Sequence, residues 1–444
     1  MSFVVLLITG LITPLFLKQH IRIAKILASE SLIVAMGLVY GGMSLHGMMP
    51  GFVTDASIRL MEYVVLASLL AVVLSVVDFE RPLIVQVLLI GAISIALLET
   101  NNLFVFVVLF EILAVVSYVL VANIRNKSNA EGAVKTFIAG AVASGIILLG
   151  FALYSFGTES FAYNDMDTAS SLTLISVAIM LAGLFYKMTI VPMHAWAADA
   201  YSQVNHTVAA LLSGVIKSVM LVVVFRAFYP YLAAFPQVNV WIFGFFALVT
   251  MTIANFMALW QKRVSRILAY SSIAHSGYAL IPFAAASSEY AYAGIVYYAV
   301  AYSFMQTSVF LLLSDLRKQA DVKNIDDLKG MGARSPLHAL LLTLQLFSLA
   351  GIPMLGGFMS KAVAFYAGVD AGLWPLVLAA LLNSALAVGY YAWMIKHLYF
   401  DAADEGAEAI KIPIGSLIGQ LILLAGTIYF GIAAGTIFGV AIPL

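Results

Sequence analysis

Four charged residues lie in long apolar segments, where a charged side chain is costly: Glu111, Lys187, Lys217 and Lys361. A lysine at the middle of a bilayer costs at least about 2.5 kcal/mol on insertion scales. Burial lowers the pKa of an amine and raises that of a carboxyl group, which brings both toward neutral pH. Such groups can take up a proton and release it again. We therefore interpret the four residues as candidate sites of proton transfer inside a membrane.

Each of them also has a structural interpretation. Glu111, Lys187 and Lys217 fall near the middle of their segments, too far from either surface for the side chain to reach water. A purely structural Glu111–Lys187 ion pair stays open. Lys361 follows a bend rich in Gly and Pro at 351–357, where half-helix ends expose backbone dipoles and admit water. There the alternative is a lysine that extends to the membrane surface.

Further polar residues could continue a proton path. His275 lies among hydroxyl-bearing neighbours between Tyr270 and Tyr278, and its reference pKa near 6.5 suits a relay. The alternative is a histidine that only hydrogen-bonds to a neighbouring helix. Tyr298, Tyr302 and Gln306 repeat every four residues and so share one helix face. That face is either a packing stripe with polar ends or the hydrated wall of a path.

The composition places these residues in a lipid environment. Of 444 residues, 63% are hydrophobic and 10% charged, with a mean hydropathy of +1.03, whereas soluble domains are about a quarter charged. Lys plus Arg and Asp plus Glu both total 22, so no basic surface for nucleic acid is expected. The absence of Cys excludes disulfides and thiolate or iron–sulfur ligation. The scattered histidines indicate neither haem nor metal.

The apolar segments predict an all-α membrane protein with about fourteen transmembrane helices, since a span needs roughly 20 apolar residues. The expected spans are 2–17, 22–46, 60–78, 82–99, 103–122, 130–156, 172–203, 205–229, 239–259, 264–286, 290–314, 336–367, 374–396 and 413–440. The first lacks the features of a signal peptide and is expected to be retained. Spans 7 and 12 are too long for one crossing and contain Pro192 and Pro353. We expect each to be a broken helix.

The basic residues predict the orientation. Seventeen of the 22 Lys and Arg lie in odd-numbered connections, and only Arg59 and Arg226 belong to the even-numbered side. By the positive-inside rule the odd side is cytoplasmic, so both termini are expected in the periplasm. The longest connection, about 315–335, is too short for a nucleotide-binding or catalytic domain. Any function must therefore be exerted in the membrane or through partners.

A weak internal repeat relates the two broken helices. Span 7 contains Leu181-Ala182-Gly183 before its proline, and span 12 contains Leu349-Ala350-Gly351 before its own. Five spans separate them, so the two elements run in opposite directions. Paired broken helices of opposite orientation are typical of transporters built from inverted repeats.

Taken together, these segments resemble the antiporter-like subunits of respiratory complex I, a family shared with cation/proton antiporters and membrane-bound hydrogenases. The matching pieces are the Glu111 helix, Tyr186-Lys187 with Val191-Pro192-Met193-His194-Ala195-Trp196, the segment Ala210–Lys217, the segment Arg266–His275, and Leu349–Pro353 leading to Lys361.

Within that family the sequence is most similar to the N subunit. The similarity rests on Glu131–Lys135, on Ala143-Ser144-Gly145, on Lys rather than Glu at 361, and on an end without a long lateral helix. It departs from the family at Ala198-Asp199, where Pro-Asp is common, and in the turn 204–208. The departures leave the shape of the bend between spans 7 and 8 open.

The resemblance implies a proton-translocating subunit of NADH:quinone oxidoreductase in a bacterial inner membrane. Four regions are expected: N-terminal spans at 1–99, two inverted five-helix units at 82–229 and 239–396, and a C-terminal span at 413–444. Each unit would form a half-channel. Glu111 and Lys187 would be a switchable pair, Lys217 the link and Lys361 the terminal proton exchanger.

His275 would continue the path between Lys217 and Lys361, along the face of Tyr298, Tyr302 and Gln306. No redox chemistry is expected in this chain. NADH, FMN, iron–sulfur clusters and quinone would belong to partner subunits of the membrane and peripheral arms. Two other functions stay open: a subunit of a sodium/proton antiporter or membrane-bound hydrogenase complex, and a membrane scaffold that moves no protons.

Overall fold

The computed structural model describes residues 1–17, 21–43, 45, 51–76, 82–122, 127–403 and 409–433, without the side chains of 17 and 127–131. Its helices are α1 Ser2–Ile12, α2 Pro14–Leu17, α3 Ile21–Tyr40, α4 Ala56–Ser75, α5 Pro82–Glu99, α6 Leu103–Ala122, α7 Lys127–Phe156, η3 Tyr163–Asp165, α8 Ser171–Lys187, α9 Ala195–Gln203, α10 His206–Ala210, η4 Leu211–Ile216, α11 Lys217–Ala234, α12 Pro236–Leu259, α13 Val264–Ala279, α14 Ile281–Ala284, α15 Ala291–Ala320, η5 Ile325–Leu328, α16 Met331–Arg334, α17 Pro336–Ala350, α18 Gly356–Asp370, α19 Trp374–Tyr399 and α20 Ile414–Ile432.

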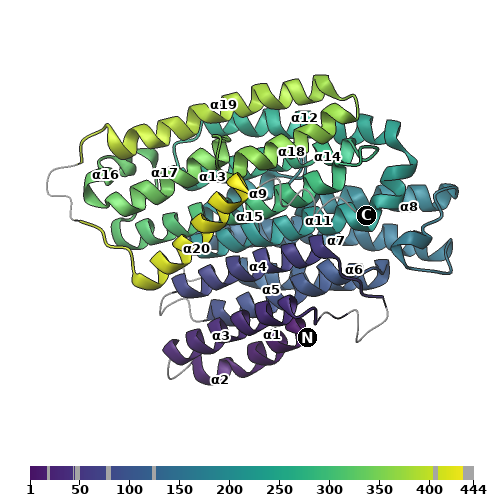
Figure 1. Cartoon of the computed structure of the whole chain (residues 1–444), viewed down its shortest axis with the longest axis horizontal. Helices are drawn as coiled ribbons and strands as arrows, with labels where there is room; N and C mark the ends of the chain where they lie inside the picture. Colours follow the sequence, from purple (N-terminus) through teal and green to yellow (C-terminus); the bar gives the residue numbers. More distant parts are fainter. Residues whose placement is uncertain are drawn as a thin grey trace.

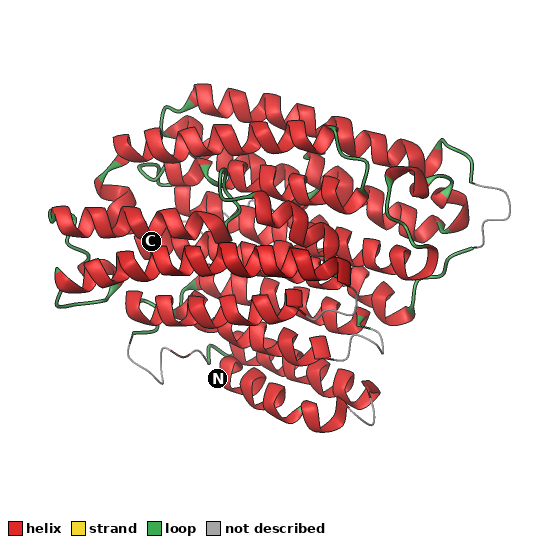
Figure 2. Ribbon diagram, turned by 180° about the vertical axis from the view of Figure 1, so that it is seen from behind, coloured by secondary structure: helices red, strands yellow, loops and turns green. Residues whose placement is uncertain are grey.

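These residues form an all-helical membrane fold, as the sequence predicts. Ten helices are long and apolar enough to cross a bilayer, and three shorter apolar helices accompany them at Ser2–Phe16, Ser171–Lys187 and Pro336–Ala350. No strand occurs in the described ranges (Figure 2). The reason is physical: lipid offers no hydrogen bonds, so a segment that crosses it must pair its own backbone groups, as a helix does.

One long helix forms the centre of the bundle. The helix α15 lies between the N-terminal helices α1, α3, α4 and α5 and the opposite layer of α12 and α19 (Figure 1). It packs against α4, α11, α13, α17, α18 and α20, and its apolar window is buried on all sides. The continuous helix His206–Ala234, made of α10, η4 and α11, is equally buried. A polar side chain on a helix that is buried on all sides must find its hydrogen-bond partners on the neighbouring helices.

Both expected helix breaks are present. The helix α8 ends at Lys187 and α9 begins at Ala195, while α17 ends at Ala350 and α18 begins at Gly356. Each break contains a non-glycine residue with left-handed backbone, Thr189 (φ 58°) and Met354 (φ 71°). Such conformations are costly, and they persist where the surrounding packing imposes them.

The two Leu-Ala-Gly tripeptides differ in local structure. Gly183 lies inside α8, whereas Gly351 is the C-cap of α17 with φ 93°. At Gly351 the left-handed backbone ends the helix, and its N–H binds the carbonyls of Phe347 and Ser348. The tripeptides therefore do not occupy equivalent positions, and they lend no support to an inverted repeat.

Several expected features lie partly outside the described residues. These are the connections at 18–20, 77–81, 123–126 and 404–408, the second span beyond 43, and the last span beyond 433. Arg59 lies inside α4 and Arg226 inside α11. Arg226 is buried, and its guanidinium donates to the carbonyl of Leu98.

The bend that the sequence left open, between spans 7 and 8, is well defined. The helix α9 ends at Gln203, and Asn205 caps the next helix by accepting from the N–H of Thr207. Asp199 on α9 forms ion pairs with Lys135 (3.1 Å) and Arg266 (3.3 Å). These contacts fix the second half of the broken helix to α7 and α13.

Candidate functional site

Lys217 is fully buried at the centre of the protein and is held by a single serine. Its side chain is 1% exposed. Its ammonium group donates to the carbonyl of Ser272 (2.9 Å) and to the hydroxyl of the same residue (2.7 Å). Tyr302 donates to that hydroxyl as well (2.7 Å), and its ring centre lies 6.0 Å from the lysine nitrogen. Ser272 therefore joins Lys217 on α11 to Tyr302 on α15.

A π-helical turn precedes Lys217. In η4 the residues Leu211–Ile216 form a wider turn within the helix His206–Ala234. Gly214 allows this turn to approach α15, since a Cβ there would lie 2.2 Å from the hydroxyl of Thr307. Single π turns inside α-helices are frequent at functional sites. Here the turn sets the rotation of the helix at Lys217.

His275 lies between two of the lysines. Its Nδ1 is 2.6 Å from the hydroxyl of Tyr298, and its ring centre is 5.3 Å from that of Tyr302. Both Lys217 and Lys361 are near enough to repel a protonated His275. The two tyrosines are fully buried and stack on each other. Two residues of the polar face that the sequence predicts on α15, Tyr298 and Tyr302, therefore lie next to His275.

Lys361 is held at the end of a helix. Its nitrogen donates to the carbonyls of Leu349 (2.9 Å) and Ala350 (3.1 Å) and to the hydroxyl of Ser384 (2.8 Å). The carbonyl end of α17 carries a partial negative charge that favours a cation. The ring of Tyr278 lies 5.2 Å away. Lys361 is only 5% exposed, so its side chain does not extend to the membrane surface.

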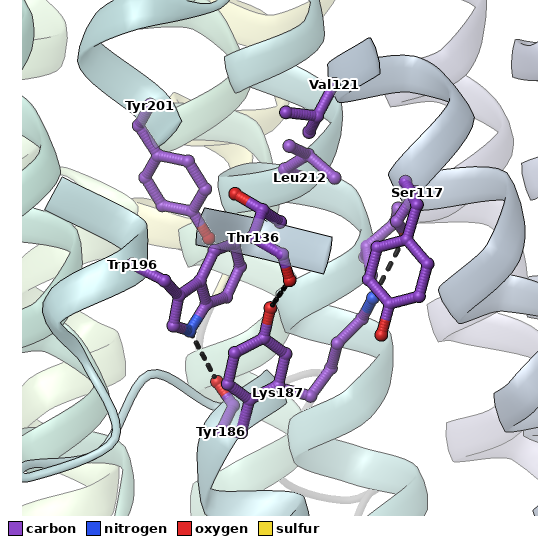
Figure 3. Close-up of a pocket in the computed structure, with 10 residues that line it drawn as sticks. Ser117, Val121, Thr136, Tyr186, Lys187, Trp196, Tyr201 and Leu212 are labelled. Carbon is purple, nitrogen blue, oxygen red and sulfur yellow. Dashed lines mark hydrogen bonds between the residues drawn. The ribbon is translucent and has the colours of Figure 1, made fainter. Parts of the chain in front are cut away.

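Lys187 lies at the break between α8 and α9, beside a small cavity (Figure 3). Its nitrogen donates to the hydroxyl of Ser117 (3.0 Å). Tyr186 and Trp196 line the same cavity and stack with ring centres 4.7 Å apart. The cavity encloses about 10 Å³, which is room for one water molecule.

Glu111 lies near Lys187, its predicted partner in a switchable pair. The two residues interact electrostatically, yet the hydrogen bond of Lys187 goes to Ser117. The buried Oε1 of Glu111 has no hydrogen-bond partner among the described residues. Among the described residues, none of the three lysines forms an ion pair with a carboxylate within 4.0 Å.

A pair of hydroxyl groups joins the first break to the centre. Thr189 follows Lys187 by two residues, and its hydroxyl lies 3.1 Å from that of Ser276 on α13. Ser276 donates to the carbonyl of Ser272 (3.4 Å), which also accepts from Lys217. The bend after Lys187 and the lysine on α11 thus share one hydrogen-bonded element.

Gln306 lies apart from His275 and faces η4 instead. Its amide nitrogen is 3.5 Å from the hydroxyl of Ser213, and its buried Oε1 has no hydrogen-bond partner in the part of the chain that the structure describes. Farther along α15, Ser314 contacts Thr207 at 3.0 Å. Arg317 lies 3.3 Å from Nε2 of His206. These pairs form a polar column between α15 and the helix His206–Ala234, from Lys217 toward the odd-numbered connections.

Sequence reasoning missed several of these partners. Ser117 and Ser384 hold Lys187 and Lys361, but isolated serines in apolar helices give no signal of their own. It also missed two buried carboxyl groups, Glu62 and Glu99. Within the described ranges, no three His, Asp or Glu residues gather in an arrangement that could hold a metal ion.

Comparison with known proteins finds related sequences over most of the chain. The family described as NADH:quinone oxidoreductase/Mrp antiporter, TM matches residues 100–387. F(420)H(2) dehydrogenase subunit N of Methanosarcina mazei is 34% identical over 75% of this chain and 71% of its own length. NADH-quinone oxidoreductase subunit N of Myxococcus xanthus is 30% identical over 92% of this chain and 89% of its own length.

Solved structures share the fold. A chain of respiratory complex I from Thermus thermophilus superposes with a TM-score of 0.83 at 23% identity, covering 99% of both chains. A chain of the Mrp complex from a Dietzia species superposes with a TM-score of 0.88 at 18% identity, covering 99% of this chain and 95% of that one.

Proposed function

Since this chain belongs to the NADH:quinone oxidoreductase/Mrp antiporter membrane family, we propose that it is a proton-translocating membrane-arm subunit of an NADH:quinone oxidoreductase. It works with the other subunits of that complex in a bacterial inner membrane. The relatives named subunit N support this assignment. In this chain Lys187, Lys217 and Lys361, with His275 between the last two, form the proton path, which we call the lysine axis.

One observation carries the proposal. The three lysines are buried, and each is held by neutral hydroxyl or carbonyl oxygens. A carboxylate partner would fix each lysine in its charged form. Neutral acceptors allow both forms: after Lys217 loses its proton, its contact with Ser272 persists with the serine hydroxyl as donor. The contacts of the three lysines are therefore compatible with repeated binding and release of a proton.

The roles follow from position along the axis. Glu111 favours a charged Lys187 through its nearby negative charge, so a change in their separation changes the proton affinity of Lys187. The Thr189–Ser276 contact links that switch to Lys217. His275 and the rings of Tyr298 and Tyr302 continue the path to Lys361, the terminal exchanger.

The polar column along α15, which includes Gln306 and Ser213, is the half-channel that supplies Lys217 from the cytoplasmic side. Hydroxyl and amide groups with unsatisfied oxygens are suited to bind water that carries protons. Gln306 has such an oxygen. The second half-channel reaches Lys361 past Ser384.

The finer architecture belongs to the same proposal. The described helices accommodate fourteen crossings, with the broken pairs α8/α9 and α17/α18 each counted as one. We assign the units 82–229 and 239–396 as the inverted halves because each contains one broken helix. The distribution of Lys and Arg supports termini that face the periplasm. The cofactors NADH, FMN and iron–sulfur clusters, together with quinone, belong to partner subunits.

The test uses the purified complex that contains this chain, reconstituted in vesicles. Lys217→Ala should lower the protons pumped per electron by more than it lowers the amount of assembled complex, because it removes both a relay group and a burial cost. Lys262→Ala, an exposed lysine of the odd side, is the control. Assembly with a wild-type pumping ratio would make Lys217 structural and overturn the proposal.

Replacing sodium with choline in the same assay separates proton pumping from sodium/proton exchange. The Mrp-like fold makes this comparison necessary. Pumping that depends on sodium would favour the antiporter function. The subunits that co-purify with the chain identify the electron donor, since one relative is named for F(420)H(2) instead of NADH.

A further inference from the structure

Two buried glutamates lie together outside the lysine axis. Glu62 is in the second turn of α4, and Glu99 is the last residue of the neighbouring helix α5. The two helices pack against each other. The residues are 1% and 2% exposed, and their carboxyl groups are within hydrogen-bonding reach of each other. Neither residue takes part in the contacts of the three lysines.

The surroundings disfavour two negative charges. Glu99 accepts a hydrogen bond from the backbone N–H of Leu45 at 2.6 Å. It lies at the carbonyl end of α5, where the helix dipole opposes an anion. The Oε1 of Glu62 is buried and accepts no hydrogen bond from the described residues. Two carboxylates this close in a buried place repel each other strongly, so that one of them stays protonated.

The surrounding cations support a single negative charge. Glu62 is attracted by Arg59 on its own helix and by the amino group of Met1 on α1. Tyr63 lies beside it. From α11, Arg226 donates to the carbonyl of Leu98, next to Glu99. These cations compensate one negative charge better than two, and the described residues offer no hydrogen bond to the Oε1 of Glu62.

We propose that Glu62 and Glu99 form a proton-binding site that holds one proton shared between their carboxyl groups. The site binds a proton whether or not the lysine axis translocates protons. It lies toward the even-numbered connections, since α4 begins there and α5 ends there. The adjoining pocket, lined by Val39, Gly42, Met43, Thr54, Arg59 and Glu62, is too small to hold a water molecule.

The test measures the protonation of each glutamate in the assembled complex, in membranes without an energy source. Dicyclohexylcarbodiimide reacts with protonated carboxyl groups in apolar surroundings: the proton passes to a carbodiimide nitrogen while the carboxyl oxygen bonds to the central carbon. Mass spectrometry of the peptides gives the modified fraction of each residue across a pH series. Because no pumping is involved, the result is independent of the proposed function.

In the wild type we expect at most one of the two glutamates to be modified in any chain. In Glu99→Gln the carboxyl of Glu62 should lose reactivity at a lower pH than in the wild type, because Glu62 no longer shares a proton with a like charge. Glu289→Gln, which removes an exposed carboxyl group, should leave the wild-type profile unchanged.

Three results would overturn the shared proton. The first is an unchanged profile of Glu62 in Glu99→Gln. The second is no modification of either glutamate at any pH while Glu111 is modified. The third is protection by sodium chloride but not by choline chloride, which would indicate a cation site. If Glu99→Gln fails to assemble, the double-modification count in the wild type decides the question.

Discussion

The hydroxyl of Thr189 lies 3.1 Å from the hydroxyl of Ser276, and this contact joins the break after α8 to α13, the helix whose Ser272 holds Lys217. Thr189 belongs to the break that follows Lys187. Ser276 binds the carbonyl that also accepts from Lys217. A movement at the break can therefore reach the central lysine through hydrogen bonds, without any ion pair between the two sites.

Replacing Thr189 with Val keeps the shape of the side chain and removes the hydroxyl. A hydrogen bond contributes about 0.5–1.5 kcal/mol, so we expect the pumping rate to fall by roughly 2- to 10-fold. Proton uptake by vesicles with the reconstituted complex measures it. Thr427→Val, which removes another buried hydroxyl, bonded to Gln345, is the control and should pump normally. Equal effects of the two substitutions would show that the Thr189 contact has no special role.

Ser272→Ala should lower pumping more than assembly. The substitution removes the hydroxyl that accepts from both Lys217 and Tyr302, while the carbonyl of residue 272 still holds the lysine. We expect a loss of about tenfold, measured as protons per electron, because only one of two acceptors remains. Ser308→Ala, which breaks a buried contact with Gln420, is the matched control. A wild-type number of protons per electron in Ser272→Ala would show that this hydroxyl is not part of the proton path.

Glu111→Gln and Lys187→Met should act non-additively. Loss of Glu111 leaves Lys187 as a buried cation without a nearby opposite charge, and adding Lys187→Met should relieve part of the assembly defect without restoring pumping. The combined effect should differ from the product of the single effects by about threefold or more, or about 0.6 kcal/mol. The amount of assembled complex and the pumping rate, measured for the two single variants and the double variant, give the double-mutant cycle. Strictly multiplicative effects would end the assignment of this pair as a switch.

Gly351→Ala tests the cap that positions Lys361. The backbone there has φ 93°, and an added Cβ would lie 3.4 Å from the lysine nitrogen. A left-handed conformation costs a residue with a side chain about 1–2 kcal/mol, so the thermal unfolding temperature should fall. In Gly145→Ala the new methyl group meets nothing within 4 Å and should leave stability equal or slightly higher. Equal unfolding temperatures of the two variants would contradict the cap.

The orientation can be tested by labelling single cysteines, because the chain has none of its own. Gln319→Cys lies at the exposed end of α15, and Glu159→Cys lies in the connection before α8. A membrane-impermeant maleimide should label residue 159 in intact cells and residue 319 only in inverted vesicles. The opposite pattern would reverse the topology and place both termini in the cytoplasm.

The sequence by itself determined the fold class, the broken helices and the family. Long apolar segments must be helices in lipid, and Pro192 and Pro353 cannot continue a regular helix; both are local properties. The resemblance to the complex I subunits is confirmed by the family match over 100–387. The buried lysines could also be found from residue type alone, because a charge in an apolar segment stands out.

Only the tertiary structure decided what each lysine touches. Lys217 and Ser272 are 55 residues apart in the chain, and no local pattern selects that serine from the others of its helix. The assignment of Glu111 and Lys187 as a switchable pair stays a prediction, and only the tertiary structure identifies Ser117 as the hydrogen-bond acceptor of Lys187. Glu62 and Glu99 lie near helix ends, where a carboxyl group usually reaches water, and only the packing of α4 against α5 buries them together.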